Sequence, residues 1–304
     1  TTTTVLHMAE VTNARIKELR DTTGAGMMDC KRALIATDGD FDEAIENLRK
    51  SGLATADKKA SRVAAEGKIA SASDDDSGKA VLVEVNCETD FVAKDSSFIS
   101  FAGNVATAAL ELDETKGDDV EVLMTKSVDG EDLEATRQAM VAKIGENIQV
   151  RRFEARGGQD GKVVGPYVHL GKIGVLVELE GGTTELATDV AMHVAAMNPP
   201  YATPEEVPQD EIAKEREILL AQVQDSGKPP EIMEKMVEGR LRKRLEEICL
   251  VSQTFVKTND KTVGKLIEDA GAKMIGFTRI VVGEGIQKKD DDFAAEVAKM
   301  AGGS

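Results

Sequence analysis

The sequence predicts an α+β fold. It comprises a three-helix module, a two-lobed core of duplicated antiparallel sheet units with a helical hairpin inserted in the second lobe, and a C-terminal helical module. Three observations predict this fold. Apolar residues recur at helical spacing over residues 9–52 and again over 209–250. Short apolar runs of strand length, such as Val81–Val85, occupy the middle of the chain. One arrangement of strand and helix signals also occurs twice, which indicates an internal repeat.

The N-terminal helices are predicted from capping residues and apolar spacing. Thr12 is a residue type that caps a first helix, and a second helix is expected over residues 27–37. Asp40 is followed three residues later by Glu43, the capping-box arrangement that begins a third helix. The following stretch, residues 53–66, is rich in Ala and Lys, and we expect it to be a helical or flexible linker.

The internal repeat predicts the two core lobes. Gly67 begins a strand-like stretch that leads to the apolar strand at Val81. Gly161 lies 94 positions after Gly67, and the matching apolar strand begins at Val175, 94 positions after Val81. Helices are expected after these two strands, over residues 98–110 and 186–197. The chain therefore holds two copies of one strand–strand–helix unit.

Residues 209–250 contain two apolar stripes separated by a breaker segment. Gly227 ends the first helix, and the two prolines that follow suit the start of the second. Two ordinary core helices would give similar stripes, but the dense charge on the other faces favours a projecting antiparallel coiled-coil hairpin. Beyond it we expect a short strand over residues 280–282 and a last helix over 292–300.

Composition is that of a soluble globular protein with 304 residues, and no apolar run approaches the roughly 18 residues of a membrane helix. The N-terminus lacks the basic and apolar regions of a secretory signal, so the three widely spaced cysteines are expected to be reduced thiols in the cytoplasm. The predicted divisions are residues 1–7 ahead of a natural start at Met8, a helical module with its linker over 8–60, core lobes over 61–160 and 161–285, and the C-terminal module over 286–304.

Known catalytic signatures are absent from the sequence. It contains no G-x-x-x-x-G-K-[ST] phosphate loop, C-x-x-C, H-E-x-x-H or G-x-S-x-G string, and its three His and three Cys are scattered. We therefore predict no cofactor, no metal site and no enzyme activity. The formal net charge of −17 and the absence of Trp argue against direct nucleic-acid binding. The chain is expected to act by docking onto another protein and changing its shape.

The most informative segment directly follows the strand at Val81–Val85. It places the acid Asp90 beside the bulky Phe91 where that strand ends. From spacing alone, the favoured interpretation is a strand-to-helix turn in which Asp90 caps the helix and Phe91 packs inward.

Several strings, from Met8 onward and in family order, resemble those of the elongation factor Ts family. The most specific is Thr89-Asp90-Phe91-Val92. The others cover Glu18–Lys31, Ala142–Asn147, Met192–Ala196, Ser226–Pro229, Lys235–Gly239 and Val282–Ile286. The resemblance implies that the N-terminal helices form a ubiquitin-associated-like module.

The resemblance also implies a partner and a mechanism. Proteins of this family are guanine-nucleotide exchange factors of the GTPase elongation factor Tu, which they bind in its GDP-bound and nucleotide-free forms. At the family's Thr-Asp-Phe-Val motif, Phe91 would wedge between partner helices, and Asp90 would add negative charge beside the partner's magnesium site. Loss of that Mg²⁺ would release GDP. The metal belongs to the partner.

Further partner contacts are implied at positions that match family contact residues. These are Arg20, Met27, Met28, Lys31, Lys59, His169, Val256 and Lys257. Spacing alone gives other interpretations. Met28 occupies a core-like helical position, a single His in a strand is more often structural, and Lys257 replaces the apolar residue expected there.

Two other classes of function stay open. An enzyme would need a convergent acid–base or nucleophilic site, which the sequence does not offer. A general interaction scaffold would use the helical module and the hairpin for various partners and would not need Asp90 or Phe91. Self-association through the hairpin is a further open alternative.

Overall fold

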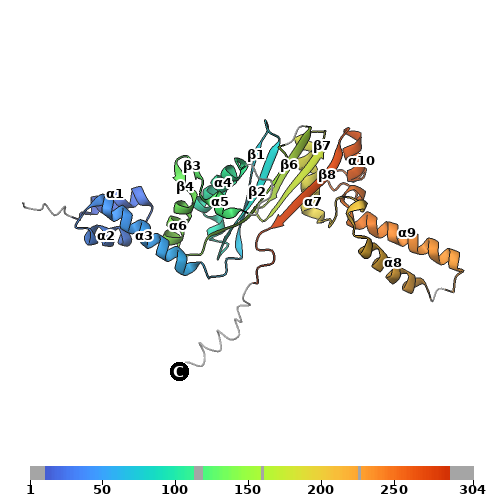
Figure 1. Cartoon of the computed structure of the whole chain (residues 1–304), viewed down its shortest axis with the longest axis horizontal. Coiled ribbons are helices and arrows are strands. Elements are labelled where there is room, and N and C mark those ends of the chain that lie inside the picture. Colours follow the sequence, from blue (N-terminus) through green and yellow to red (C-terminus); the bar gives the residue numbers. More distant parts are fainter. Residues whose placement is uncertain (1–10, 113–118, 159–160, 225–226, 288–304) are drawn as a thin grey trace, which may run out of the picture.

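The computed structural model describes residues 11–112, 119–158, 161–224 and 227–287. The predicted start at Met8 and the predicted helix over 292–300 lie outside these residues. Within them the molecule is elongated, with a helical module at one end, two sheets in the middle and a helical hairpin at the other end (Figure 1). The chain does not run straight from one end to the other, because its last described strand, which comes after the hairpin, returns to the sheets in the middle.

Three helices form the N-terminal module: α1 (Asn13–Thr23), α2 (Met27–Ala36) and α3 (Phe41–Lys59). The predicted caps are confirmed, because the Thr12 side chain accepts a hydrogen bond from the Arg15 N–H and Asp40 accepts one from the Glu43 N–H. A small core joins the helices, formed by Ile16, Leu19, Cys30, Ala33, Leu34 and Ala44. Helix α3 continues to Lys59, so the first half of the predicted linker is helical.

The first sheet has the antiparallel order β1–β2–β5. Its strands are β1 (Glu66–Asp74), β2 (Lys79–Cys87) and β5 (Gln149–Arg156). The helices and the small hairpin of this lobe are η1 (Val92–Lys94), α4 (Ser96–Leu110), α5 (Val120–Met124), β3 (Ser127–Val128), β4 (Glu131–Asp132) and α6 (Leu133–Ile144). Val81, Val83 and Val85 pack with Phe98 and Phe101 in the core of this lobe.

The second sheet has the antiparallel order β6–β7–β8. Its strands are β6 (Lys162–His169), β7 (Ile173–Glu180) and β8 (Lys273–Val281), and its helices are α7 (Thr184–Met197), η2 (Pro204–Glu206), η3 (Leu250–Ser252) and α10 (Val263–Asp269). The predicted strand over 280–282 was too short, because β8 pairs with β7 from Lys273 onward. Polar residues and Gly276 interrupt the apolar pattern of β8 and conceal its length from a reading of sequence alone.

The structure confirms the repeat. Two antiparallel strands and a helix follow one another in each lobe, and the third strand pairs with the second in each sheet. The register of β2 with β5 shifts between Glu84 and Val85, and that of β7 with β8 shifts between Glu178 and Leu179, again 94 positions on. Between the sheets lies a shared apolar cluster of Ile69, Ala80, Leu82, Val164, Leu176 and Ile280. Strand β2 is thus buried on both faces.

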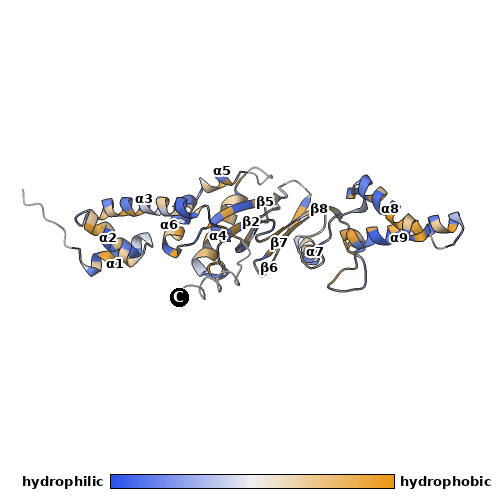
Figure 2. Ribbon diagram, turned by 90° about the horizontal axis from the view of Figure 1, so that it is seen from below, coloured by the Kyte–Doolittle hydropathy of each residue, from blue (hydrophilic) through white to orange (hydrophobic). Residues whose placement is uncertain are grey.

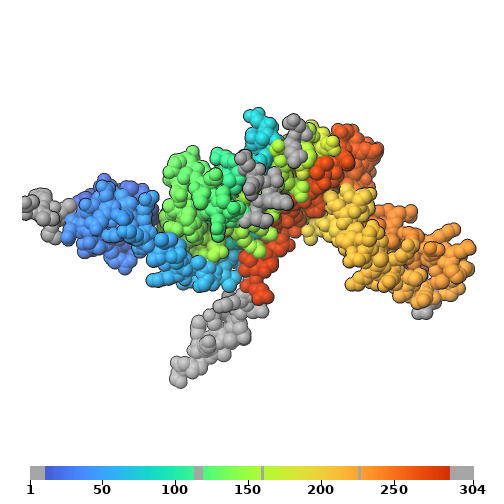
Figure 3. All heavy atoms as spheres, in the orientation of Figure 1, coloured from blue at the N-terminus to red at the C-terminus, as the bar shows by residue number. Residues whose placement is uncertain are grey.

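Helices α8 (Gln209–Gln224) and α9 (Pro230–Ile248) form the predicted hairpin. They pack on each other through their own cluster, which includes Leu219, Val223, Val237 and Leu241. The pair projects from the body in the space-filling view, and apolar and polar residues alternate along both helices (Figures 2 and 3). The hairpin prediction is therefore confirmed over the core-helix alternative. Among the described helices, none has the length and apolarity needed to span a bilayer.

Candidate functional site

The loop between β2 and η1 exposes Phe91. Its side chain is 82% exposed, whereas the next two residues, Val92 and Ala93, are buried in the core of the first lobe. The interpretation that Phe91 packs inward is therefore wrong. Asp90 does not cap the following helix either, because Asp95 accepts the capping hydrogen bonds from the first turn of α4. The two apolar residues after Phe91 thus pack in the core, while the phenylalanine ring itself stays in solvent.

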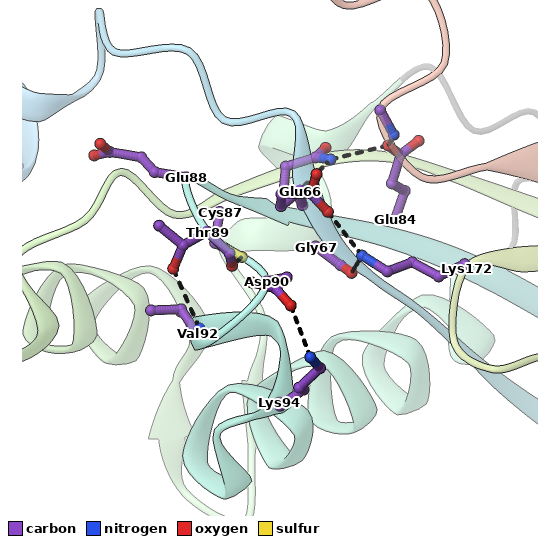
Figure 4. A network of polar contacts seen from close by, with 12 residues as sticks. Glu66, Gly67, Glu84, Cys87, Glu88, Thr89, Asp90, Val92, Lys94 and Lys172 are labelled. Carbon is purple, nitrogen blue, oxygen red and sulfur yellow. Dashed lines mark hydrogen bonds and ion pairs between the residues drawn. The ribbon is translucent and has the colours of Figure 1, made fainter. Parts of the chain in front are cut away.

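Asp90 lies beside Phe91 with its carboxylate half exposed and paired with Lys94 (Figure 4). The Lys94 Nζ donates to Asp90 Oδ2 at 2.7 Å. This hydrogen bond and the charge of Lys94 hold the pKa of Asp90 below its usual range. The carboxyl group is therefore ionised at neutral pH, and the tip of the loop presents an apolar ring and a negative charge side by side.

The loop is anchored by a residue that sequence reasoning did not identify. Glu146, just beyond the end of α6, accepts hydrogen bonds from the backbone N–H of Glu88 at 3.1 Å and of Thr89 at 3.0 Å, and from the Thr89 hydroxyl at 2.7 Å. The only sequence signal for it was its place in the Ala142–Asn147 string.

The turn between β6 and β7 lies beside the start of β1, because Lys172 of the turn reaches the first two residues of that strand (Figure 4). Lys172 Nζ is 3.0 Å from Glu66 Oε2 and donates to the Gly67 carbonyl at 3.1 Å. On this turn His169 is exposed at the end of β6, and its ring stacks against Tyr167. Leu170, which follows it, is 84% exposed with a positive φ of 51°.

The expected contacts of the N-terminal module share one property: their side chains are exposed. They are Arg20, Met27, Met28 and Lys31. The core-like interpretation of Met28 is wrong, because its side chain is 64% exposed while Cys30, Ala33 and Leu34 fill the core. Lys59 differs from these four, because its Nζ donates to the Gly145 carbonyl within the chain.

Val256 and Lys257 lie on a separate surface, next to α7. Val256 is partly exposed, and its N–H donates to Nδ1 of the buried His193 at 3.1 Å. The other ring nitrogen of His193 is 2.9 Å from Gln253 Oε1, so it carries the proton and donates. Lys257 is exposed and pairs with Asp189 at 3.0 Å. The charge of Lys257 is therefore balanced within the chain.

We expect stability to fall on acidification through His193. Burial lowers the pKa of His193 below 6.5. As the pH falls through about 6.5, the unfolded chain binds a proton that the folded chain excludes, so the free energy of unfolding decreases until the folded pKa is reached. Urea unfolding from about pH 7.5 to about pH 5.5 should show this decrease. The free energy of unfolding of His193→Asn should be lower than that of the parent at neutral pH, but it should change less with pH over this interval. An equal pH slope in both proteins would contradict the assignment.

The thiol nearest the loop and the metal-ligating side chains of the described residues are the candidates for chemistry by the chain itself. The thiol nearest the loop, Cys87, is fully buried, and burial raises its pKa to about 12, so it stays protonated. Within the described ranges, no group of three or more His, Cys, Asp or Glu could hold a metal ion. Thr89, Asp90, Phe91 and Val92 follow one another in one segment, in which Val92 is buried, and the other expected contacts are spread along the molecule (Figure 1). Such spacing suits a large partner held at several points.

Comparisons with known proteins identify the family of the chain. Residues 88–284 match the profile of the family described as Elongation factor TS. The chain is 55% identical to the elongation factor Ts of Thioalkalivibrio sulfidiphilus over 294 residues, which cover 97% of this chain and 99% of that protein. It is 54% identical to that of Alkalilimnicola ehrlichii over 95% of this chain and 98% of the relative. It is 53% identical to that of Xanthomonas campestris pv. campestris over 96% of this chain and 99% of the relative. The chain belongs to the elongation factor Ts family of translation elongation factors.

Proposed function

We propose that this chain binds GDP-bound elongation factor Tu, disturbs its magnesium and phosphate site, and promotes GDP release and exchange for GTP. The observation that carries the proposal is the loop after β2, where the 82% exposed ring of Phe91 lies beside the ionised Asp90. A bulky apolar side chain exposed on an anchored loop is suited to burial in a partner. Membership of the family supports elongation factor Tu as that partner and the cytoplasm as the setting.

The proposed action displaces groups of the partner and makes or breaks no covalent bond. Phe91 would separate elements that support the partner's magnesium ion, and Asp90 would place a negative charge near them. Loss of Mg²⁺ removes the ion that screens the diphosphate, so GDP leaves faster. The chain is in this sense not an enzyme, and the ion and both nucleotides belong to the partner.

One side chain is not enough for a large effect. A thousandfold acceleration of release requires about 4 kcal/mol, whereas burying a Phe side chain supplies about 1.5–3 kcal/mol. The rest of this free energy would come from the exposed residues of the N-terminal module, from the β6–β7 turn and from Val256 and Lys257. The coupling is reciprocal, because a factor that weakens GDP binding is itself weakened by GDP to the same extent. GTP binding would then displace the factor from the nucleotide-free partner.

Stopped-flow fluorescence tests the proposal. Elongation factor Tu loaded with fluorescent GDP is mixed with excess unlabelled GDP, with and without this chain. We expect the chain to accelerate release by about a hundredfold or more, in a manner that saturates with its concentration. Release at the same rate with and without the chain would contradict the proposal. The scaffold interpretation would then be favoured.

A further inference from the structure

One carboxylate, that of Glu146, accepts three hydrogen bonds from the segment from which Phe91 projects. Glu146 Oε2 accepts from the N–H groups of Glu88 and Thr89, and Oε1 accepts from the Thr89 hydroxyl. Bonds to an ionised carboxylate are shorter and stronger than those between neutral groups. All three donors belong to the two residues directly before Asp90. The carboxylate therefore fixes the chain just where it leaves β2 for the exposed tip.

Glu146 is itself held in place on both sides. The preceding residue, Gly145, ends α6 with a φ of +85°, and its carbonyl accepts the Lys59 ammonium from the end of α3. The following residue, Asn147, is buried, and its side chain donates to the carbonyl of Arg62 at 2.7 Å. The Asn147 N–H donates to Glu88 Oε1 at 2.6 Å. The turn at residues 145–147 thus joins the end of the N-terminal module to the loop.

We propose that Glu146 is a positioning residue that sets the Thr89–Phe91 loop for insertion into the partner, an inference that rests on the proposed function. Phe91 has few contacts of its own, so the direction of its ring depends on the backbone beneath it. A loop that is mobile before docking must be ordered during docking, and the entropy lost opposes insertion. Fixing the loop in advance removes that cost from the step in which GDP is released.

Hydrogen exchange on the isolated chain tests the anchor without the partner. Glu146→Ala should speed exchange of the Glu88 and Thr89 amide hydrogens by about tenfold, because they lose their acceptor. Glu134→Ala is the matched control. Glu134 lies on α6, and its described hydrogen bonds go to Arg137 and Gln138 of the same helix rather than to the loop. Unchanged exchange at both loop amides in Glu146→Ala would overturn the proposal.

GDP release from elongation factor Tu tests the consequence. Glu146→Ala should lower the maximal release rate by about tenfold and leave the half-saturating concentration within about twofold, because the distant contacts remain. Glu146→Gln should recover much of the rate, since its carbonyl oxygen can still accept the two backbone N–H groups. The double variant Glu146→Ala/Phe91→Ala should release GDP little more slowly than Phe91→Ala alone, because both changes remove the same effect, the insertion of the Phe91 ring.

These outcomes separate the two proposals. If the parent accelerates release and Glu146→Ala matches its maximal rate, the positioning role is wrong and the exchange function stands. A change confined to the half-saturating concentration would also overturn the positioning role. If the parent itself does not accelerate release, the proposed function fails, and the inference that rests on it fails as well. Thermal unfolding of each variant confirms that the compared proteins are folded.

Discussion

Replacing Phe91 with alanine is expected to slow the release of GDP from elongation factor Tu by about tenfold to a hundredfold at saturating concentrations of the chain. The expected loss follows from the 1.5–3 kcal/mol gained when a Phe side chain is buried, since about 1.4 kcal/mol corresponds to a factor of ten in rate. The ring is 82% exposed in the free chain and contributes little to its core. The free energy of unfolding should therefore stay within about 0.5 kcal/mol of the parent value. Stopped-flow release and urea unfolding of the same preparations measure the two quantities.

Two further variants make this result specific to the loop. Phe91→Leu keeps an apolar side chain of smaller size, so its maximal rate of GDP release should lie between those of the parent and Phe91→Ala. Ile218→Ala removes an exposed apolar side chain from α8, in the hairpin at one end of the molecule and away from the loop, and should leave the maximal rate unchanged (Figure 1). Equal release by the parent and Phe91→Ala would show that the ring does not drive exchange. A large loss of stability in Phe91→Ala would show that the ring packs against the chain in solution.

Elements with strong local signals were predictable from the sequence. The caps at Thr12 and Asp40 satisfy backbone N–H groups within a few residues, so their effect does not depend on the rest of the fold. The 94-residue repeat was also visible, because the equivalent strands are buried on both faces and keep their apolar residues. β8 was found only at its end, because its polar residues and Gly276 are tolerated through pairing with β7.

Side-chain orientation at the candidate site was not predictable in the same way. Apolar character alone favours burial for Phe91 and Met28, but each core has room for a limited set of side chains. Val92 and Ala93, which follow Phe91, belong to the core of the first lobe, and Cys30, two residues after Met28, belongs to that of the N-terminal module. The role of Glu146 depends on contacts with residues more than fifty positions earlier, for which spacing gives no signal.

The two lobes are joined through a buried charge, and we expect its removal to be the most destabilising of the changes considered. Glu84 on β2 is 0% exposed and accepts from Arg152 Nε at 2.6 Å, from Arg151 Nη1 at 3.1 Å and from the Gly283 N–H at 2.7 Å. Arg152 also donates to the Val281 carbonyl at the end of β8. One carboxylate in the first lobe therefore holds two strands of its own sheet and the turn that follows β8 of the second.

Glu84→Gln should lower the free energy of unfolding by about 3 kcal/mol, because it weakens several hydrogen bonds to one buried charged group. Glu178→Gln is the matched control. Glu178 occupies the equivalent position of the second repeat, pairs with Arg156 of the first lobe at 3.3 Å and with Lys162 of its own sheet at 3.4 Å, and retains slight exposure. It holds no backbone N–H of the other lobe among its described contacts, so we expect a loss of about 1 kcal/mol. Urea unfolding measures both, and equal losses would mean that the bond from the Gly283 N–H and the deeper burial of Glu84 add nothing beyond an ion pair between the lobes.

The pH dependence of the stability lost in Glu84→Gln tests whether that loss is electrostatic. Burial by itself would raise the pKa of Glu84, but the bonds from the Gly283 N–H, Asn86 and Arg152 outweigh it and hold the pKa below 4.5. The folded chain therefore keeps the charge at a pH where the unfolded chain is protonated. The stabilisation is complete above about pH 4.5 and is lost as the pH falls toward the folded pKa. The difference between the parent and Glu84→Gln should shrink over that interval, whereas a difference that arose from packing alone would not change with pH.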